Sequence, residues 1–290
     1  MTRELVLLPN PVAGTGRNDA MVASVATRLR DAGFSVRELL GADAAESERL
    51  ARDAVAAGVD GLVVCGGDGM VNVAAQVLAG TQTPLGIVPM GTGNDTARSL
   101  GLPVKDPLAA TDAIIAGRTR TIDLARSGGR YFVTVLAAGF DAAVNERANS
   151  MRWPRGQLKY SLAIVAVLKE FKPIRYTLDL DGETRRVDGM LVSVGNGDSM
   201  GGGLKVTHGA AMDDGLLDVV VFTSVPRREL LKTYPKLFSG GHTRHPAYQR
   251  HRVRRVTVAA PGVVAYADGE RFGELPLTVE VVPAAMRVFA

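Results

Sequence analysis

The fold is decided by the stretch GLVVCGGDGMVNVAAQVLAGTQTPLGIVPMGTGND at residues 61–95. Its unbroken apolar runs 61–65 and 85–89 each predict a strand that is buried on both faces. Between them, apolar residues at helical spacing over 71–78 predict a helix that ends at Gly80. Buried strands that alternate with helices are typical of a parallel sheet covered on both sides.

The same alternation extends outward along the first third of the chain. Each predicted strand is short and apolar, and each predicted helix closes at a glycine. These elements are strands over 5–8 and 34–40 and helices over 18–32, 46–57 and 107–116. Residues 1–124 are therefore expected to form an α/β unit with a Rossmann-like parallel sheet.

The pattern changes near residue 122, after which strand-like segments dominate. Asp-Gly pairs at 181–182 and 268–269 predict hairpin turns between them. The predicted strands are 131–137, 175–180, 190–194, 216–222, 252–259 and 263–267, with helices over 157–171 and 227–238. Residues 125–283 are expected to form a mainly antiparallel β-sandwich unit, and residues from about 284 to 290 to pack back onto the first unit.

The composition excludes several classes of protein. With 290 residues, 46% hydrophobic and 22% charged, the chain has an ordinary globular composition. Its single cysteine, Cys65, rules out an intrachain disulfide and fits a reducing compartment, so a cytoplasmic location is expected. The longest apolar run, 162–168, is too short for a membrane span.

The positive charge gathers in one stretch. Residues 226–255 hold nine Lys or Arg against one acid, Glu229, whereas the whole chain has a net charge of +4. Such a stretch suits an anionic membrane surface or a phosphorylated substrate, and a solvated basic face remains an alternative. Nucleic acid is not expected as a partner because aromatic residues make up only 5% of the chain.

Three glycine-rich turns follow predicted parallel strands. Ligands of open α/β sheets bind outside these strand ends, where glycines let backbone N–H groups approach phosphate. The turns are Asn10-Pro11-Val12-Ala13-Gly14, Gly66-Gly67-Asp68-Gly69 and Gly91-Thr92-Gly93-Asn94-Asp95. They predict a nucleotide site, although neither a P-loop nor a complete G-x-G-x-x-G is present.

Read together, five segments resemble a known family. They are NPVAG, VVCGGDGMVN, PLGIVPMGTGNDTARSLGLP, NGDSMGGGLKVTHGAAMDDGLLDVV and ADGE, which span Asn10 to Glu270 in order. They are similar to the bacterial soluble lipid kinases of the diacylglycerol kinase catalytic family, which is related to sphingosine and ceramide kinases. The GGDG turn alone is also shared with NAD kinases and 6-phosphofructokinases.

The resemblance implies an ATP site in a cleft between the two units. Residues 10–14, the segment Gly66 to Asn72 (including Met70 and Val71) and the turn Gly91 to Asp95 would hold the nucleotide. Two positions depart from the family pattern. Residues 40–43 read Leu-Gly-Ala-Asp where a nucleotide-binding threonine is usual, and Met70 replaces a common threonine.

The resemblance also implies catalytic and metal residues. Glu270 would be the general base and Asp268 its partner or a metal contact, with the reverse order left open, and Asp68 would help to bind Mg–ATP. A structural Mg²⁺ would be held by Asp214 with the carbonyls of Ala211 and Leu216. From spacing alone, both Asp-Gly elements are more readily interpreted as plain hairpin turns.

The implied activity is ATP-dependent transfer of the γ-phosphate to a lipid hydroxyl, diacylglycerol giving phosphatidic acid in phospholipid biosynthesis. A transient contact with anionic membranes is expected, and a homodimer is left open. The apolar segment 158–171 is read either as a core helix or as the border of an acyl-chain pocket. Arg147, Arg152 and Arg155 around Trp153 would add to a membrane-facing surface.

Three different functions remain open beside this one. Gly197-Asp198-Ser199-Met200-Gly201 matches the G-x-S-x-G elbow of serine hydrolases, with later acids (Asp214, Asp218) and histidines (His242, His245) in triad order. The run Gly201-Gly202-Gly203 is a poor start for the helix that an elbow needs. A non-catalytic nucleotide or lipid sensor is the second possibility, and an NAD kinase is the third.

Overall fold

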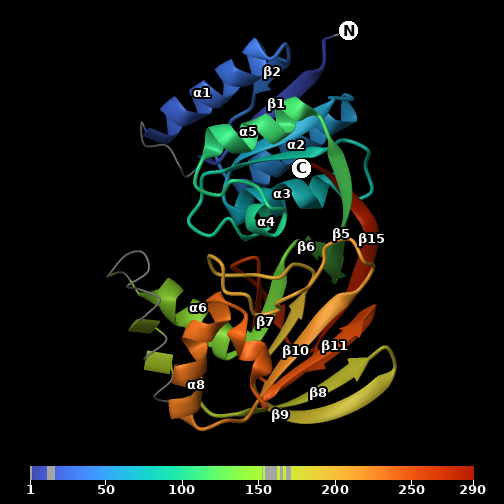
Figure 1. The fold of residues 1–290 in the computed structure, drawn as a ribbon. Helices are drawn as coiled ribbons and strands as arrows, with labels where there is room; N and C mark the ends of the chain where they lie inside the picture. Colours follow the sequence, from blue (N-terminus) through green and yellow to red (C-terminus); the bar gives the residue numbers. More distant parts are fainter. Residues whose placement is uncertain (1, 12–16, 152, 154–161, 164–165, 168–170) are drawn as a thin grey trace.

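The computed structural model describes residues 2–11, 17–151, 153, 162–163, 166–167 and 171–290. Two lobes lie one above the other in Figure 1, and strands run continuously between them. Several predicted positions lie outside the described residues: Val12, Ala13 and Gly14 of the first glycine turn, Arg152 and Arg155, and most of the helix predicted over 157–171.

The upper lobe has a parallel sheet with the strand order β2–β1–β3–β4. Leu5 and Leu7 of β1 pack with α1 and α5 on one face, and Val6 and Leu8 pack with α2 and α3 on the other. The predicted parallel sheet with two covered faces is thereby confirmed. The elements are β1 (Glu4–Pro9), α1 (Arg17–Asp31), β2 (Ser35–Glu38), α2 (Ala44–Ala56), β3 (Gly61–Gly66), α3 (Asp68–Leu78), β4 (Leu85–Pro89), α4 (Asp95–Ser99) and α5 (Pro107–Ala116).

The start of α3 differs from the prediction in a way that shapes the cleft. The helix begins at Asp68 instead of Val71, with Gly67 as its N-cap and no side-chain cap. The GGDG motif is therefore the first turn of a helix. The short helix α4, which sequence periodicity does not predict, begins at Asp95 in the same region.

The lower lobe is mainly antiparallel, as predicted, and the interior of its sheet is apolar. The longest of its internal strands, β9, pairs with β8 along its first half and with β7 and β10 along its second. No helix in the described ranges is long and apolar enough to cross a membrane. The elements are β6 (Arg130–Phe132), β7 (Val135–Gly139), α6 (Phe140–Ser150), β8 (Ile174–Leu180), β9 (Glu183–Gly195), β10 (Leu217–Thr223), α8 (Arg227–Thr233), η2 (Tyr234–Phe238), η3 (Gly241–Arg244), β11 (Tyr248–Val253), β12 (Arg255–Ala259), β13 (Val264–Ala267) and β14 (Glu270–Glu274).

Two predicted strands are each broken in the structure, and both breaks have the same cause. The run 131–137 is interrupted because the N–H groups of Val133 and Thr134 donate to Asp268. The run 252–259 is interrupted at Arg254, whose N–H donates to Asp181. In each case a hairpin carboxylate takes a backbone donor that a strand ladder would otherwise use.

A ribbon of two strands joins the lobes. β5 (Thr119–Ser127), which the sequence analysis does not predict, contains the expected division at residue 124 and pairs with β15 (Leu277–Phe289). β15 pairs with β12 in the lower lobe, and its Val288 pairs with Leu85 of β4 in the upper lobe. The last strand of the chain therefore passes from the lower sheet into the upper one (Figure 1).

Candidate active site

The glycine-rich turns meet at the carboxyl ends of the parallel strands. A Cβ built on Gly91 would overlap the Cα of Gly67, so these two backbones touch. A Cβ on Gly66 would lie 3.4 Å from the Cβ of Asn10, and one on Gly93 would lie 2.8 Å from Oδ2 of Asp68. Side chains at these glycines would fill the space, so the turns form a compact backbone cradle.

Asn94 shapes the third turn. Its Oδ1 accepts from the N–H of Gly91 at 3.0 Å, and its Nδ2 donates to the carbonyl of Gly91 at 2.9 Å. The residue has a φ of 54°, a left-handed conformation that asparagine tolerates better than most residues. The Asn94 side chain is thus used to hold the turn.

Asp68 joins two of the turns. Its Oδ2 accepts from the N–H of Asp95 at 3.1 Å, and its Oδ1 accepts from the N–H of Thr96 at 2.9 Å. Burial raises the pKa of Asp68 to about 6, and the nearby charges of Asp95 and Asp268 add to the rise. Because burial disfavours the ionised form of Asp68, a bound cation or a further hydrogen-bond donor would stabilise that carboxylate strongly.

Asp95 connects the upper lobe to the lower one. Its Oδ2 accepts from the N–H of Gly202 and its Oδ1 from that of Gly203, both at 2.7 Å. The carboxylate is buried, which raises its pKa, while these donors oppose the rise. The predicted nucleotide residue Asp95 is therefore also a contact between the lobes.

The hydrolase interpretation of G-x-S-x-G is wrong. The Ser199 hydroxyl is fully buried and donates to Asp95 at 3.2 Å. The chain then passes through Gly201, Gly202 and Gly203, all at positive φ, and forms no helix. A nucleophile elbow needs an exposed serine at the start of a helix.

The two acids of the DGE element have different surroundings. Asp268 accepts from Asn72 Nδ2 at 2.9 Å, Val133 N at 2.8 Å and the N–H and hydroxyl of Thr134 at 2.9 and 2.6 Å. These bonds tie the hairpin to α3 and to the start of β7. Asp268 is therefore a positioning residue, and the expectation that it contacts a metal is not supported by this geometry.

Glu270 faces the first turn of α3. Its carboxylate is exposed, and its Oε1 lies 3.4 Å from where a Cβ on Gly69 would stand. Within the described residues it forms no hydrogen bond or ion pair. The hairpin of the lower lobe therefore presents a carboxylate directly to the GGDG turn of the upper lobe.

Further residues predicted to bind the nucleotide serve the scaffold. Met70 and Val71 are buried in the upper core and offer no side chain to a ligand. Asn72 donates to Asp268 and accepts from Gln76, whose Nε2 and Oε1 bond the backbone of Tyr131 at 2.9 and 3.0 Å. Asn72 and Gln76 therefore join α3 to β6 in the lower lobe.

The predicted structural magnesium site does not fit the residues present. Oδ1 of Asp214 accepts from the N–H of Leu216 at 3.0 Å, and Oδ2 pairs with the guanidinium of Arg252. No cluster of three or more potential metal-ligating His, Cys, Asp or Glu side chains occurs in the described ranges. A guanidinium already neutralises the carboxylate that Mg²⁺ would need.

Asp123, which no motif in the sequence singles out, organises this loop. Its Oδ2 accepts from the N–H of Gly215 and its Oδ1 from that of Ala284, at 2.7 and 2.8 Å. Its own carbonyl accepts from the buried Asn196 at 3.0 Å. A single acid between the apolar residues Ile122 and Leu124 was the available signal, since buried carboxylates need donors.

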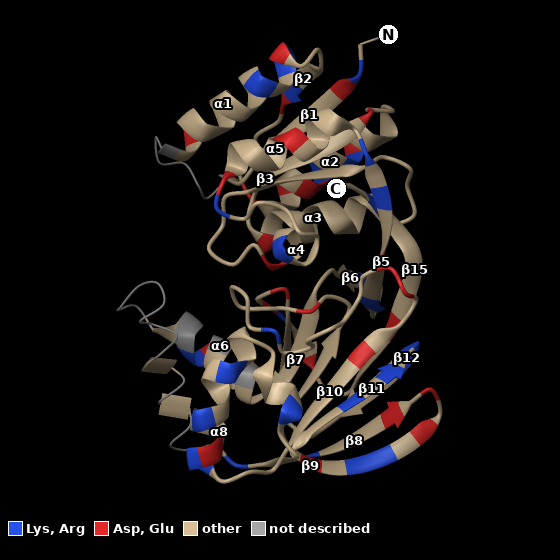
Figure 2. Cartoon of the chain, viewed as in Figure 1, with Lys and Arg blue, Asp and Glu red and all other residues tan. Residues whose placement is uncertain are grey.

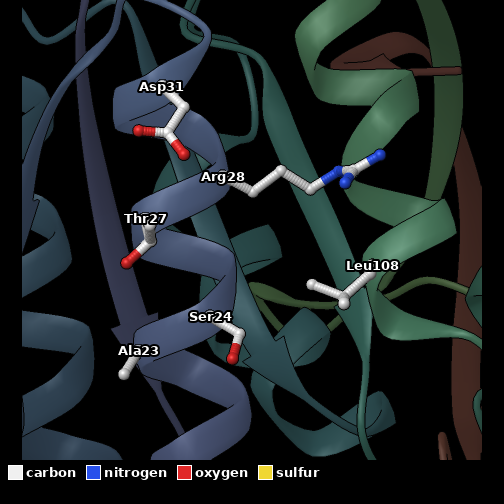
Figure 3. A pocket seen from close by; sticks show the side chains of 6 residues that line it. All are labelled: Ala23, Ser24, Thr27, Arg28, Asp31 and Leu108. Atoms are coloured by element: carbon white, nitrogen blue, oxygen red, sulfur yellow. The ribbon is translucent and has the colours of Figure 1, made fainter.

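A groove of about 480 Å³ between α1 and α5 lies elsewhere (Figure 3). None of the residues that line it belongs to the glycine turns. Its one cation, Arg28, is paired with Asp112 at 2.6 Å, so nothing in the groove points to an anionic ligand. The lining residues are Ala23, Ser24, Thr27, Arg28, Asp31 and Leu108.

Comparisons with known proteins show which family the chain resembles. The family described as "Diacylglycerol kinase catalytic domain" matches residues 4–127, and the "YegS C-terminal NAD kinase beta sandwich-like domain" matches residues 134–290. A Mycobacterium tuberculosis H37Rv protein named diacylglycerol kinase is 43% identical over 98% of this chain and 94% of its own. A Pseudomonas fluorescens protein named probable lipid kinase YegS-like is 31% identical over 93% of this chain and 90% of its own.

The fold is also similar to solved structures. Two Bacillus anthracis Sterne crystal structures, one described as that of a diacylglycerol kinase, superpose with TM-scores of 0.83 and 0.77. They are 22% and 20% identical and cover 99% of this chain and 95% and 96% of theirs. At this identity the likeness establishes the fold alone. The family matches across both lobes, together with the relative that is 43% identical over 98% of this chain, show that the chain belongs to the diacylglycerol kinase catalytic-domain family of lipid kinases.

Proposed function

We propose that the protein transfers the γ-phosphate of ATP to the hydroxyl of a membrane lipid, with diacylglycerol as the acceptor and phosphatidic acid as the product. The observation that carries this proposal is the approach of Glu270 to Gly69. It places a free carboxylate from one lobe opposite the glycine-rich helix start of the other. Phosphoryl transfer needs chiefly this kind of positioning, together with neutralisation of charge.

The triphosphate is assigned to the backbone cradle. The first turn of α3 has no side-chain cap at Gly67, so its N–H groups and the positive end of the helix are available to phosphate oxygens. Gly91 and Gly93 leave the space that the phosphates need. Mg²⁺ would arrive with ATP as part of the substrate, and Asp68, which lies beside Gly93, is assigned as the carboxylate that would contact it.

Glu270 is assigned as the general base. It accepts the proton of the lipid hydroxyl while the hydroxyl oxygen bonds to the γ-phosphorus. The bond between that phosphorus and the oxygen of the β-phosphate breaks, and ADP leaves. Asp268 is not the base because four donors already occupy its two oxygens, so the order Glu270 as base and Asp268 as support is preferred.

The test is incubation of the protein with γ-labelled ATP, Mg²⁺ and separate acceptors. The panel contains diacylglycerol, a sphingoid base, phosphatidylglycerol and NAD, because NAD kinases share the GGDG turn. Labelled phosphatidic acid is the expected product. Labelled NADP, or ATP turnover without labelled lipid, would overturn the proposal.

A further inference from the structure

The helix α8 and the short helix η2 present a two-sided surface. Leu230, Thr233 and Leu237 are buried, and the two leucines pack in an apolar cluster with Phe140 and Val144 of α6. The opposite side is exposed, including Leu231 at 51% and Phe238 at 54% of their surface. We call the exposed side chains the α8–η2 surface: Arg227, Arg228, Leu231, Lys232, Lys236 and Phe238.

The cations of the α8–η2 surface have no acidic partner in the part of the chain that the structure describes. Arg227, Arg228, Lys232 and Lys236 form no ion pair with any described residue, and the acid on the same helix, Glu229, bonds to His245 at 2.9 Å. Figure 2 shows the blue of Lys and Arg on α8, next to the red of its acid. The predicted basic stretch 226–255 is therefore not one face.

The rest of the basic stretch is partly neutralised. Arg250 pairs with the buried Asp218 at 2.5 Å, and Arg252 pairs with Asp214. These two arginines lie on β11 and are used inside the lower lobe. Arg244, Arg254 and Arg255 are exposed and form no ion pair with a described residue, so some uncompensated charge also lies elsewhere in the stretch. The α8–η2 surface is the part of the stretch that combines four such cations with the exposed side chains of Leu231 and Phe238.

Exposed apolar side chains gather around the same cluster. The described residues include five exposed large apolar side chains, of which Leu40 alone lies in the upper lobe. The other four are Trp153, Leu162, Leu231 and Phe238. Each lies within two residues of a side chain that packs in this cluster: Met151, Ala163, Leu230 and Leu237.

A groove beside the start of α8 is also lined by both apolar and cationic side chains. It has a volume of about 440 Å³ and is lined by the apolar Phe171, Met190 and Val225 together with the cations Lys172 and Arg227. Apolar walls next to unpaired cations suit a molecule that is apolar at one end and anionic at the other.

We propose that the α8–η2 surface docks the protein on an anionic phospholipid bilayer. The cations would lie among the lipid phosphates while Leu231 and Phe238 enter the boundary of the acyl chains. A second copy of the chain fits less well, because a two-fold interface would place these like charges against one another. The proposal rests on the proposed function in one respect: docking would bring the enzyme to the bilayer that holds its acceptor lipid.

The α8–η2 surface is one loop away from the cleft. The carbonyl of Leu237 in η2 accepts from the N–H of Lys205 at 2.9 Å. The same loop supplies Gly202 and Gly203 to Asp95. A bilayer on this surface would therefore lie beside the loop that closes onto the candidate active site.

The first test neutralises the charge. The variant R228Q/K232Q/K236Q and the matched control K105Q/R118Q/R120Q, which removes three upper-lobe cations, are bound to phosphatidylglycerol–phosphatidylcholine vesicles. Each cation near such a surface raises the affinity for the vesicle about fivefold. The first variant should therefore bind roughly a hundredfold more weakly, and the control should bind like the wild type. Equal binding by all three proteins would overturn the proposal.

The second test removes the apolar contacts. L231N/F238N should bind these vesicles about tenfold more weakly, whereas L40N should not change binding. Trp153 is the only tryptophan, so its emission should shift to the blue on anionic vesicles and not on pure phosphatidylcholine. Unchanged emission on vesicles that do bind the protein, together with unchanged binding by L231N/F238N, would place the docking surface elsewhere.

The outcomes separate this proposal from the proposed function. The charge variant should keep wild-type turnover with a water-dispersed short-chain diacylglycerol and lose it with vesicle-embedded substrate. Loss of turnover with both substrates would contradict a docking role. Vesicle binding without any kinase activity would sink the proposed function and leave the docking surface intact. Self-association that depends on the α8–η2 surface, without vesicle binding, would instead assign it to a second copy.

Discussion

The glycine-rich cleft and the loop 211–216 are both predicted from glycine-containing motifs. In the structure the cleft residues lie together, whereas the predicted metal ligand of the loop is already paired with an arginine. In the cleft, the turns 66–69 and 91–95 meet within contact distance, Asn10 lies beside Gly66, and Glu270 approaches Gly69. In the loop, the predicted ligand Asp214 is paired with Arg252. Glycines dictate backbone shape locally, so their consequences are readable from sequence. The partner of a carboxylate depends on what the rest of the chain brings to it.

The largest expected effect is on catalysis and concerns Glu270 in the cleft. Glu270→Gln should lower lipid phosphorylation by at least about a hundredfold, because the amide cannot accept the hydroxyl proton. Stability should not change, since the carboxylate is exposed and unbonded among the described residues. The readouts are single-turnover transfer and thermal unfolding.

The control for Glu270 lies on the same strand. Glu274→Gln changes an equally exposed acid whose partner is Arg271, at 3.3 Å. It should leave transfer unchanged. Near-normal turnover in Glu270→Gln, or an equal loss in both variants, would remove the assigned base.

Asp268→Asn tests whether the hairpin is held by its carboxylate. An amide would turn two donors toward groups that already donate, so the free energy of unfolding should fall by about 2 kcal/mol. Transfer should fall with it because Glu270 would no longer be held over Gly69. Urea unfolding and steady-state kinetics provide the two readouts.

Asp181→Asn is the matched control for Asp268→Asn. Asp181 has the same positive φ in an Asp-Gly turn and likewise accepts backbone N–H groups, from Arg254 and Arg255, but far from the cleft. Asp181→Asn should lower the free energy of unfolding and leave the turnover of lipid substrate unchanged. A turnover loss of the same size in both variants would show that hairpin stability, not Glu270 position, is being measured.

The pH dependence of stability tests the acid cluster of the cleft. Asp68 has a pKa raised to about 6 in the folded chain, so it binds a proton that the unfolded chain releases near its usual value of 3.8. Its contribution is therefore favourable at low pH and is lost as pH rises toward about 6. Between about pH 7 and about pH 5 the wild type should gain roughly 1 kcal/mol relative to Asp68→Asn.

Urea unfolding of both proteins at both pH values measures this difference. Because every other titrating group is common to the two proteins, the comparison reports Asp68 together with its coupling to Asp95 and Asp268. Parallel pH profiles would mean that the carboxyl is not destabilised in the folded state.

The smallest expected effect concerns the loop 211–216. Because Asp214 and Arg252 form a partly exposed pair, Asp214→Asn should change stability by less than about 1 kcal/mol. Added Mg²⁺ without nucleotide should shift the melting temperature of neither protein. A Mg²⁺-dependent rise in the wild type that disappears in Asp214→Asn would restore the metal site.

Sequence reasoning reached the parallel sheet, the antiparallel second lobe and the positions of the glycine turns, since each follows from local periodicity or backbone freedom. It missed α4 and β5, which are fixed by partners distant in sequence, such as Asp68 for the start of α4. It assigned nucleotide roles to Met70 and Val71, whose side chains are buried in α3, a helix that begins three residues earlier than predicted. The roles of Asp123 and Asn196 could not be read from spacing because their donors and acceptors come from four separate segments.

The pairing of β5 with β15 also determines the order in which the two lobes can be completed during synthesis. The lower lobe is inserted between two strands of the upper one, so the upper sheet lacks its last neighbour until residues 285–289 have left the ribosome. Nascent chains that end at residue 127 would hold the catalytic-domain segment yet leave the exposed side of β4 unpaired, open to aggregation. The upper lobe is encoded first and completed last, and separate expression of the two lobes should yield insoluble upper-lobe fragments.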